Sequence, residues 1–210
     1  WPRVAREAGL TTVATHIGPR DVMPFMMSGR GARFLDACAR YGIQVEHELH
    51  AIDWLLPRAM FATDPSFFRM NAKGERTPDS NCCPSNPFAL EVIACRAVEA
   101  ARVCRSTTGR YFYWMTDNGE KCNCPKCKPL SGAEQAVIVE NAIVRALRVE
   151  IDPNATLAHL AYQFTMDPPR LVKPDPHLFL EFAPIERWHA KGVQRREPLA
   201  EGGSWLAKLD

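Results

Sequence analysis

The sequence lacks several features that would place the protein in a class at once. No apolar run approaches the ~18 residues needed to cross a bilayer, so we expect no membrane-spanning helix. Charge of one sign is not in excess, because 26 basic residues stand against 24 acidic ones and the net charge is +2. This balance gives no electrostatic reason to expect nucleic acid as a partner.

Internal repeats, low-complexity segments and a glycine-rich phosphate turn after a predicted strand are also missing. The last absence argues against an open doubly wound sheet that binds a nucleotide. The chain begins at Trp1 without a signal-peptide pattern, so we expect an internal fragment or a processed chain, and the N-terminus does not indicate the compartment. The length of 210 residues, with 46% hydrophobic and 24% charged residues, fits one globular domain with a real core.

Predicted strands and helices alternate along the chain. Strands are expected at residues 10–16, 43–52, 110–116, 155–165 and 177–183. Helices are expected at residues 29–42, 86–105 and 131–149. Local signals bound these helices: Gly42 ends the first, Asn86-Pro87 opens the second, and Ser131 with Glu134 forms a capping box for the third.

This alternation argues for parallel βαβ units. Five strands are too few to close a barrel, since a complete eight-stranded barrel takes about 250 residues. We therefore expect an α/β fold, namely a partial (β/α)8 TIM-type barrel of about five parallel βα units, with the remaining strands absent. Residues 1–190 would form the partial barrel, and residues 191–210 an irregular tail or the start of the next unit.

Each predicted strand carries an ionisable or amide side chain near its C-terminal end. Because side chains alternate across a strand, every second residue shares a face. The expected sets are Thr12, Ala14 and His16; Glu46, Glu48 and His50; Tyr111, Tyr113, Met115 and Asp117; Leu157, His159, Ala161 and Gln163; and Phe179, Glu181 and Ala183. We expect these sets to line one inward face, where barrel enzymes carry their active sites at the C-terminal strand ends.

Two carboxyl groups across a sugar are what glycoside hydrolysis requires. Asp117 as the acid and Glu181 as its partner is the simplest catalytic assignment. The candidate substrate-binding residues are His16, His50, Trp114, His159 and Gln163. Structural alternatives stay open, because histidines and tryptophans often only pack a core, and Glu46 and Glu48 are as readily explained by structural ion pairs with barrel arginines.

Three of the eight cysteines lie within six residues, in the C-x-C-x-x-C arrangement of Cys122, Cys124 and Cys127. Three thiolates this close repel one another unless a cation compensates them, and Zn²⁺ is the natural occupant. Cys83 is the best candidate for a fourth ligand of a structural zinc site, since its loop and the cysteine loop are expected to follow neighbouring strands. A disulfide from Cys83 to Cys122 or Cys124 and simple free thiols remain alternatives.

Five stretches together resemble a known bacterial family: residues 47–58, 65–87, 110–131, 157–169 and 179–187. The family is characterised only as a domain of unknown function, and its members are similar to glycoside-hydrolase-type TIM barrels, distantly like α-glucuronidases and β-hexosaminidases. The resemblance covers roughly Leu10 to Trp188. It implies polysaccharide-related chemistry and an extracellular or periplasmic location.

The resemblance also implies roles for single residues. The family's aspartate-glycine pair after the aromatic strand corresponds here to Asp117-Asn118-Gly119, which is one residue longer. The family's cysteine before a Ser-Asn-Pro turn corresponds to Cys83, which supports Cys83 as the fourth metal ligand. An acidic position of the closest subgroup corresponds to Glu181.

The sequence thus supports three functional hypotheses. The preferred one is an enzyme that hydrolyses O-glycosyl bonds of a polysaccharide or oligosaccharide from a bacterial, plant or algal source. The alternatives are a non-catalytic carbohydrate-binding barrel and a zinc-stabilised structural domain. Carbohydrate is the expected partner in the first two.

Overall fold

The computed structural model describes residues 1–117 and 119–183, and these form an α/β fold. In this part of the chain, five strands make one sheet: β1 (Thr12–Thr15), β2 (Gln44–His50), β3 (Arg110–Trp114), β4 (Thr156–Ala161) and β5 (Leu178–Phe182). Neighbouring strands are parallel and follow the order β1-β2-β3-β4-β5. The prediction of successive parallel βα units is confirmed.

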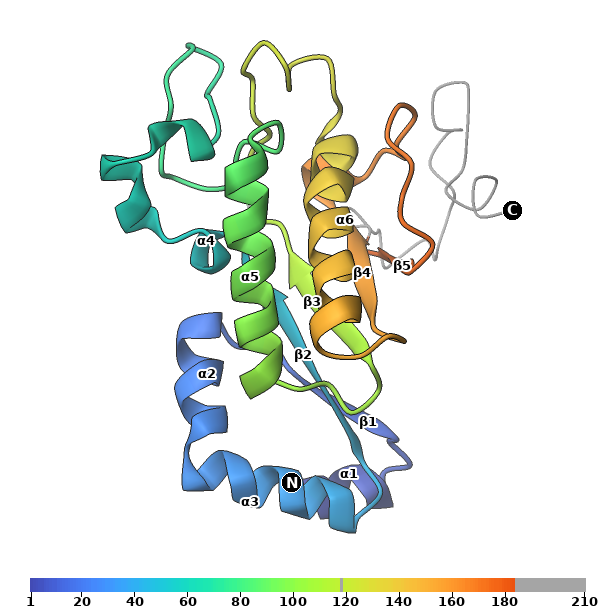
Figure 1. Cartoon of the computed structure of the whole chain (residues 1–210). Coiled ribbons are helices and arrows are strands. Elements are labelled where there is room, and N and C mark those ends of the chain that lie inside the picture. The colour runs from blue at the N-terminus through green and yellow to red at the C-terminus, as the bar shows by residue number, and fades with distance from the viewer. Residues whose placement is uncertain (118, 184–210) are drawn as a thin grey trace, which may run out of the picture.

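The helices lie on one face of this sheet. They are α1 (Pro2–Glu7), α2 (Pro19–Met27), α3 (Gly29–Arg40), α4 (Ile52–Leu55), α5 (Pro87–Val103) and α6 (Gly132–Glu150). Figure 1 shows α5 and α6 side by side in front of the strands. Helices α1, α2 and α4 were not predicted, although Pro19 opens α2 directly after Gly18. No helix of the described segments combines the length and apolarity that a bilayer crossing would require.

Short-range signals place the helix ends where the sequence predicted them. The Asn86 side chain accepts hydrogen bonds from the backbone N–H groups of Phe88 and Ala89, which fixes the start of α5. Ser131 and Glu134 form the expected capping box of α6. Gly42 adopts a φ of 64° just after α3, a conformation that residues with a Cβ rarely adopt.

The main core fills the space between the helices and one face of the sheet. Leu49, Tyr113 and Leu157 project into it from three neighbouring strands and are 2% exposed or less. They pack against α2, α5 and α6, and each buried apolar side chain of this kind contributes about 1.5–3 kcal/mol. A separate cluster on the opposite face contains Phe112, Trp114 and Ala158. We call this opposite side the inner face.

Strand β4 is shorter than predicted. It ends at Ala161, and Gln163–Thr165 form a 3-10 turn rather than the last residues of a strand. The Thr165 hydroxyl accepts a hydrogen bond from the Tyr162 N–H and donates one to the Leu160 carbonyl, so it occupies backbone groups that a continuing strand would have paired. Gln163 takes a φ of 47°, which ends the extended conformation.

The strand order contains no reversal, in contrast to doubly wound sheets. The five-stranded parallel sheet is therefore compatible with part of a (β/α) barrel. The segments that precede α5 and α6 project together beyond the N-terminal ends of these helices, which is the end where the strands finish (Figure 1). The segment before α5 includes two 3-10 turns, Arg58–Ala62 and Pro65–Phe67. Most of the candidate residues lie at this end of the sheet.

Candidate functional site

The inner face brings together residues from four strands. The backbone register pairs His50 with Trp114 across β2 and β3, and Leu160 with Glu181 across β4 and β5. Paired residues of neighbouring strands project to the same side of a sheet. His50, Trp114 and Glu181 therefore share the inner face, as the sequence analysis expected for His50 and Glu181.

Two histidines flank Trp114. The ring centroid of His16 lies 5.7 Å from that of Trp114, and the centroid of His50 lies 5.1 Å away on an edge-on approach. The His50 Nδ1–H donates a hydrogen bond of 2.7 Å to the Met115 carbonyl, which fixes the orientation of the ring. Trp114 is only 4% exposed, and its indole N–H acts as a hydrogen-bond donor to the Glu181 carboxyl group.

Glu181 is half-buried on this face. Burial raises the pKa of its carboxyl group, and the charge of Glu48 raises this pKa further. The Trp114 indole and His16 act in the opposite direction without cancelling the rise. One oxygen of this carboxyl group is buried, and the Trp114 indole is its hydrogen-bond donor among the described side chains. The carboxyl group of Glu181 therefore keeps its proton to a higher pH than an exposed glutamate does, which suits a general acid.

The two glutamates of β2 have different partners. Glu46 is buried and forms an ion pair of 2.7 Å with Arg110 as well as a hydrogen bond of 2.6 Å from the Thr108 hydroxyl. This is the structural ion pair with an arginine that the sequence analysis considered. Glu48 instead lies 3.4 Å from the Nδ1 atom of His16. Glu48 is therefore held by a histidine at the inner face.

Asp117 lies just beyond the end of β3 and contacts Tyr162. The Tyr162 hydroxyl donates a hydrogen bond to the Asp117 carboxylate. Desolvation raises the pKa of Tyr162, and the charge of Asp117 and this hydrogen bond raise it further. Gln163 donates a hydrogen bond of 3.2 Å from its amide to the same hydroxyl. Asp117 and Gln163 thus meet at Tyr162, beyond the ends of β3 and β4.

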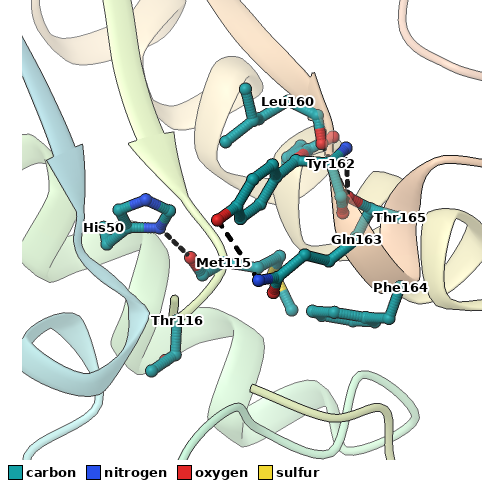
Figure 2. A pocket seen from close by; sticks show the side chains of 9 residues that line it. His50, Met115, Thr116, Leu160, Tyr162, Gln163, Phe164 and Thr165 are labelled. Carbon is teal, nitrogen blue, oxygen red and sulfur yellow. Dashed lines mark hydrogen bonds between the residues drawn. The ribbon is translucent and has the colours of Figure 1, made fainter. Parts of the chain in front are cut away.

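A small pocket opens between the ends of β2, β3 and β4 (Figure 2). His50 and Tyr162 border it on opposite sides, and Gln163 reaches across it toward the Tyr162 hydroxyl. The complete lining consists of His50, Met115, Thr116, Glu140, Leu160, Tyr162, Gln163, Phe164 and Thr165. Two of the predicted substrate-binding residues, His50 and Gln163, therefore border one pocket.

His159 does not join the inner face. It is 2% exposed, and its Nδ1 atom lies 2.7 Å from a carboxyl oxygen of Glu140 on α6. Residues alternate along β4, so His159 projects to the same side as the core residue Leu157, whereas Leu160 projects with Glu181. The expectation that His159 faces the same side as Glu181 was therefore wrong. The sequence analysis likewise placed on the wrong face four residues that belong to the helix-side core: Tyr111, Tyr113, Met115 and Leu157.

The four predicted cysteine ligands form one buried cluster. The Sγ atoms of Cys83, Cys122, Cys124 and Cys127 all lie within 4.8 Å of one another, and each side chain is at most 4% exposed. The Sγ atom of Cys83 is 3.7 Å from that of Cys124, far beyond the ~2.05 Å of a disulfide bond. Hydrogen bonds from the Cys122 and Cys127 thiols lower the pKa of Cys83. This cluster is able to hold a metal ion.

Donors from three surrounding residues point at the sulfur atoms. The Met70 N–H donates to the Cys122 sulfur over 3.3 Å, and the Arg76 guanidinium approaches the same atom to 3.8 Å. The Ser85 hydroxyl lies 3.2 Å from the Cys83 sulfur. Positive charge and N–H donors around thiolates offset the negative charge that four of them would carry with one divalent cation.

One protein family matches most of the chain. A family model described as "Domain of unknown function (DUF4838)" matches residues 26–205. The chain belongs to this family. Apart from His16, every candidate site residue of this DUF4838 chain lies inside the matched range. No curated protein matches the chain.

Sequence reasoning missed the residues that fix the loops of this DUF4838 domain. Asn81 accepts a hydrogen bond from the Thr116 N–H and donates one to the Glu120 carbonyl, so it bridges the two loops beside Asp117. Arg69 binds Asp79 and Glu120 through its guanidinium group, with N–O distances of 2.5 and 2.9 Å. The contacts of Asn81, and that of Arg69 with Glu120, join residues 35 to 51 positions apart, and the contact of Arg69 with Asp79 lies within a proline-rich loop. No local sequence pattern predicts such contacts.

Proposed function

We propose that the protein is a glycoside-hydrolase-like enzyme that acts on a polysaccharide or oligosaccharide, and that its sheet is part of a (β/α) barrel. The sequential parallel strands, the helices on one face and the polar groups on the inner face support this proposal. In such barrels the inner face and the C-terminal strand ends carry the catalytic groups. Carbohydrate is the proposed partner.

The single observation that carries the proposal is the environment of Glu181. Its carboxyl group lies half-buried on the inner face, with the Trp114 indole as a hydrogen-bond donor and with a raised pKa. A carboxyl group of this kind can protonate the leaving oxygen of a glycoside. Glycoside hydrolysis needs a second carboxylate, and Asp117 is the candidate that the sequence indicates.

The small pocket between the ends of β2, β3 and β4 supplies groups suited to sugar hydroxyls. The imidazole of His50, the hydroxyl of Tyr162 and the amide of Gln163 can each donate or accept a hydrogen bond. Trp114 is too buried to offer an open stacking plane, so its contribution would come from the indole N–H, which acts on the Glu181 carboxyl group. A polyhydroxylated ligand satisfies such mixed donors and acceptors better than an apolar ligand does.

The proposal is tested with a panel of 4-methylumbelliferyl glycosides and with plant, algal and bacterial polysaccharides, by measuring fluorescence and new reducing ends. We expect hydrolysis of at least one substrate, with kcat lowered about 10²- to 10⁴-fold in Glu181→Gln. Glu99→Gln is the matched control, because Glu99 is exposed on α5 and forms an ion pair with Arg96 across 3.9 Å, away from the inner face. Glycan binding without hydrolysis by the wild type would favour the non-catalytic carbohydrate-binding barrel instead.

A second, structural function follows from the cysteine cluster, and we propose that it holds one Zn²⁺ ion. Zinc bound by four thiolates has bonds of about 2.3 Å in a tetrahedron, whose edges are then about 3.8 Å. The Cys83 sulfur lies 3.7 Å from that of Cys124 and 3.9 Å from that of Cys127. Four protein ligands leave no position for substrate. This zinc would therefore join the loop that carries Cys83 to the loop that carries Cys122, Cys124 and Cys127, rather than take part in a reaction.

A further inference from the structure

A third carboxyl group, that of Glu48, acts electrostatically on Glu181 and raises its pKa. The sequence-based assignment of Asp117 and Glu181 did not anticipate this effect. The charged groups that act on Glu181 come from β2 and from the residue after β1, in the order Glu48, His16 and Glu46. Glu46 is already neutralised by Arg110 at 2.7 Å and is buried. Glu48 is therefore the carboxylate whose charge bears most directly on Glu181.

The position of Glu48 follows from the register of the sheet. It pairs with Phe112 of β3, two residues before the pair of His50 and Trp114, so its side chain projects to the inner face one layer deeper. The Phe112 ring in turn packs edge-on against that of Phe179, which shares the face of Glu181. Glu48 and Glu181 thus project to the same face of the sheet, from strands β2 and β5 on either side of β3 and β4.

His16 connects the two acids. Its Nδ1 atom lies 3.4 Å from the Glu48 carboxylate, its ring packs on Trp114 at 5.7 Å, and its charge acts on Glu181. The Glu48 side chain is 28% exposed, so solvent or a ligand can reach it. Asp117 has a different neighbour, since the Tyr162 hydroxyl hydrogen-bonds it beyond the ends of β3 and β4.

We propose that Glu48, oriented by His16, is the partner carboxylate of Glu181, and that Asp117 with Tyr162 binds substrate hydroxyls instead. This inference rests on the proposed glycoside hydrolysis.

Glu181 donates its proton to the glycosidic oxygen as the bond from that oxygen to the anomeric carbon breaks, and the electron pair stays on the oxygen. A water oxygen bonds to the anomeric carbon while Glu48 takes the water proton. Solvent returns that proton to Glu181, so one water is consumed per bond.

The partnership is tested first without any substrate. The titration of the Glu181 carboxyl carbon is followed by ¹³C NMR in the full chain and in the variants Glu48→Gln and Asp117→Asn. We expect the Glu181 titration to move to lower pH in Glu48→Gln, because a like charge is removed, and to move less in Asp117→Asn. The control is Glu99→Gln. An unchanged Glu181 titration in Glu48→Gln would overturn the inference.

Kinetics then separate this inference from the proposed function. On the best substrate of the 4-methylumbelliferyl panel, we expect Glu48→Gln to lower kcat about 100-fold or more, with KM little changed. We expect Asp117→Asn mainly to raise KM. If Glu181→Gln abolishes hydrolysis but Asp117→Asn lowers kcat and Glu48→Gln does not, the proposed function stands and the role of Glu48 is refuted. If Glu181→Gln leaves hydrolysis intact, the proposed function itself fails.

Discussion

Gln135 and Cys122 hold one another through two hydrogen bonds in the buried interior. The Cys122 N–H donates to the Gln135 side-chain oxygen over 2.8 Å, and the Gln135 amide donates back to the Cys122 carbonyl over 2.9 Å. The same amide also reaches the Cys127 carbonyl at 3.0 Å. One side chain in the first turns of α6 therefore fixes both ends of the cysteine loop.

Replacing Gln135 with leucine should destabilise the protein by about 3 kcal/mol, because it leaves the buried N–H and carbonyl groups of Cys122 without their partners. The measurement is the urea midpoint of unfolding at pH 7, read by circular dichroism. Gln44→Leu is the control, since Gln44 is exposed at the start of β2. Equal midpoints for the two variants would show that the Gln135 hydrogen bonds contribute nothing particular to stability.

Zinc content tests the cluster directly. The protein purified without a metal-chelating step should contain about one equivalent of zinc by plasma mass spectrometry, and Cys122→Ser should contain almost none. Cys38→Ser is the matched control, because Cys38 is 1% exposed but lies in α3 outside the cluster. Metal loss should also lower the unfolding temperature, since binding energy of the ion contributes to folding. Zinc-free wild-type protein of full stability would contradict the proposal.

His47 should make stability depend on pH. Burial lowers the pKa of this histidine from 6.5 to about 4. Between these values the unfolded chain binds a proton that the folded protein does not, so stability falls as pH falls from 6.5 to 4, by up to about 3 kcal/mol. Urea unfolding at pH 7 and pH 4.5 should show a smaller loss for His47→Gln than for the wild type. Identical losses would mean that another group sets this dependence.

His159 should matter for stability and not for ligand binding. Removing one member of the buried pair with Glu140 leaves the other uncompensated, so His159→Ala should cost about 3 kcal/mol or more. His177→Ala is the control, because the pair of His177 with Asp175 is partly exposed and should be worth less than about 1 kcal/mol. A folded His159→Ala protein with normal stability but lost glycan binding would restore the original prediction for this residue.

Much of the fold follows from short-range signals in the sequence. Asn86-Pro87, the pair Ser131 and Glu134, and Gly42 each mark a helix end through contacts within three residues, so they act the same way in any tertiary context. The cysteine cluster was predictable for a related reason, since three of its members lie within six residues.

The faces of β3 and β4 were not predictable in the same way. Alternation states which residues share a side, but Tyr111–Trp114 are buried on both sides, and so are most residues of β4. Both faces of these strands are apolar in the sequence. Only packing against α5 and α6 therefore decides that Trp114 lies on the inner face and His159 on the helix side. The pairing of Glu48 with His16 depends likewise on two strands coming together.

The central claim is that sugar binds at the inner face, where the Trp114 indole N–H acts on the Glu181 carboxyl group. The most direct measurement is a ¹H–¹⁵N NMR titration of the full chain with the oligosaccharides of the activity panel, with the Trp114 indole resonance assigned through Trp114→Phe. Because this N–H acts on the Glu181 carboxyl group, sugar that engages this carboxyl should change its surroundings, and the account predicts a saturable shift of its signal, weakened in Glu181→Gln. An indole signal that stays fixed while an oligosaccharide binds would contradict the account.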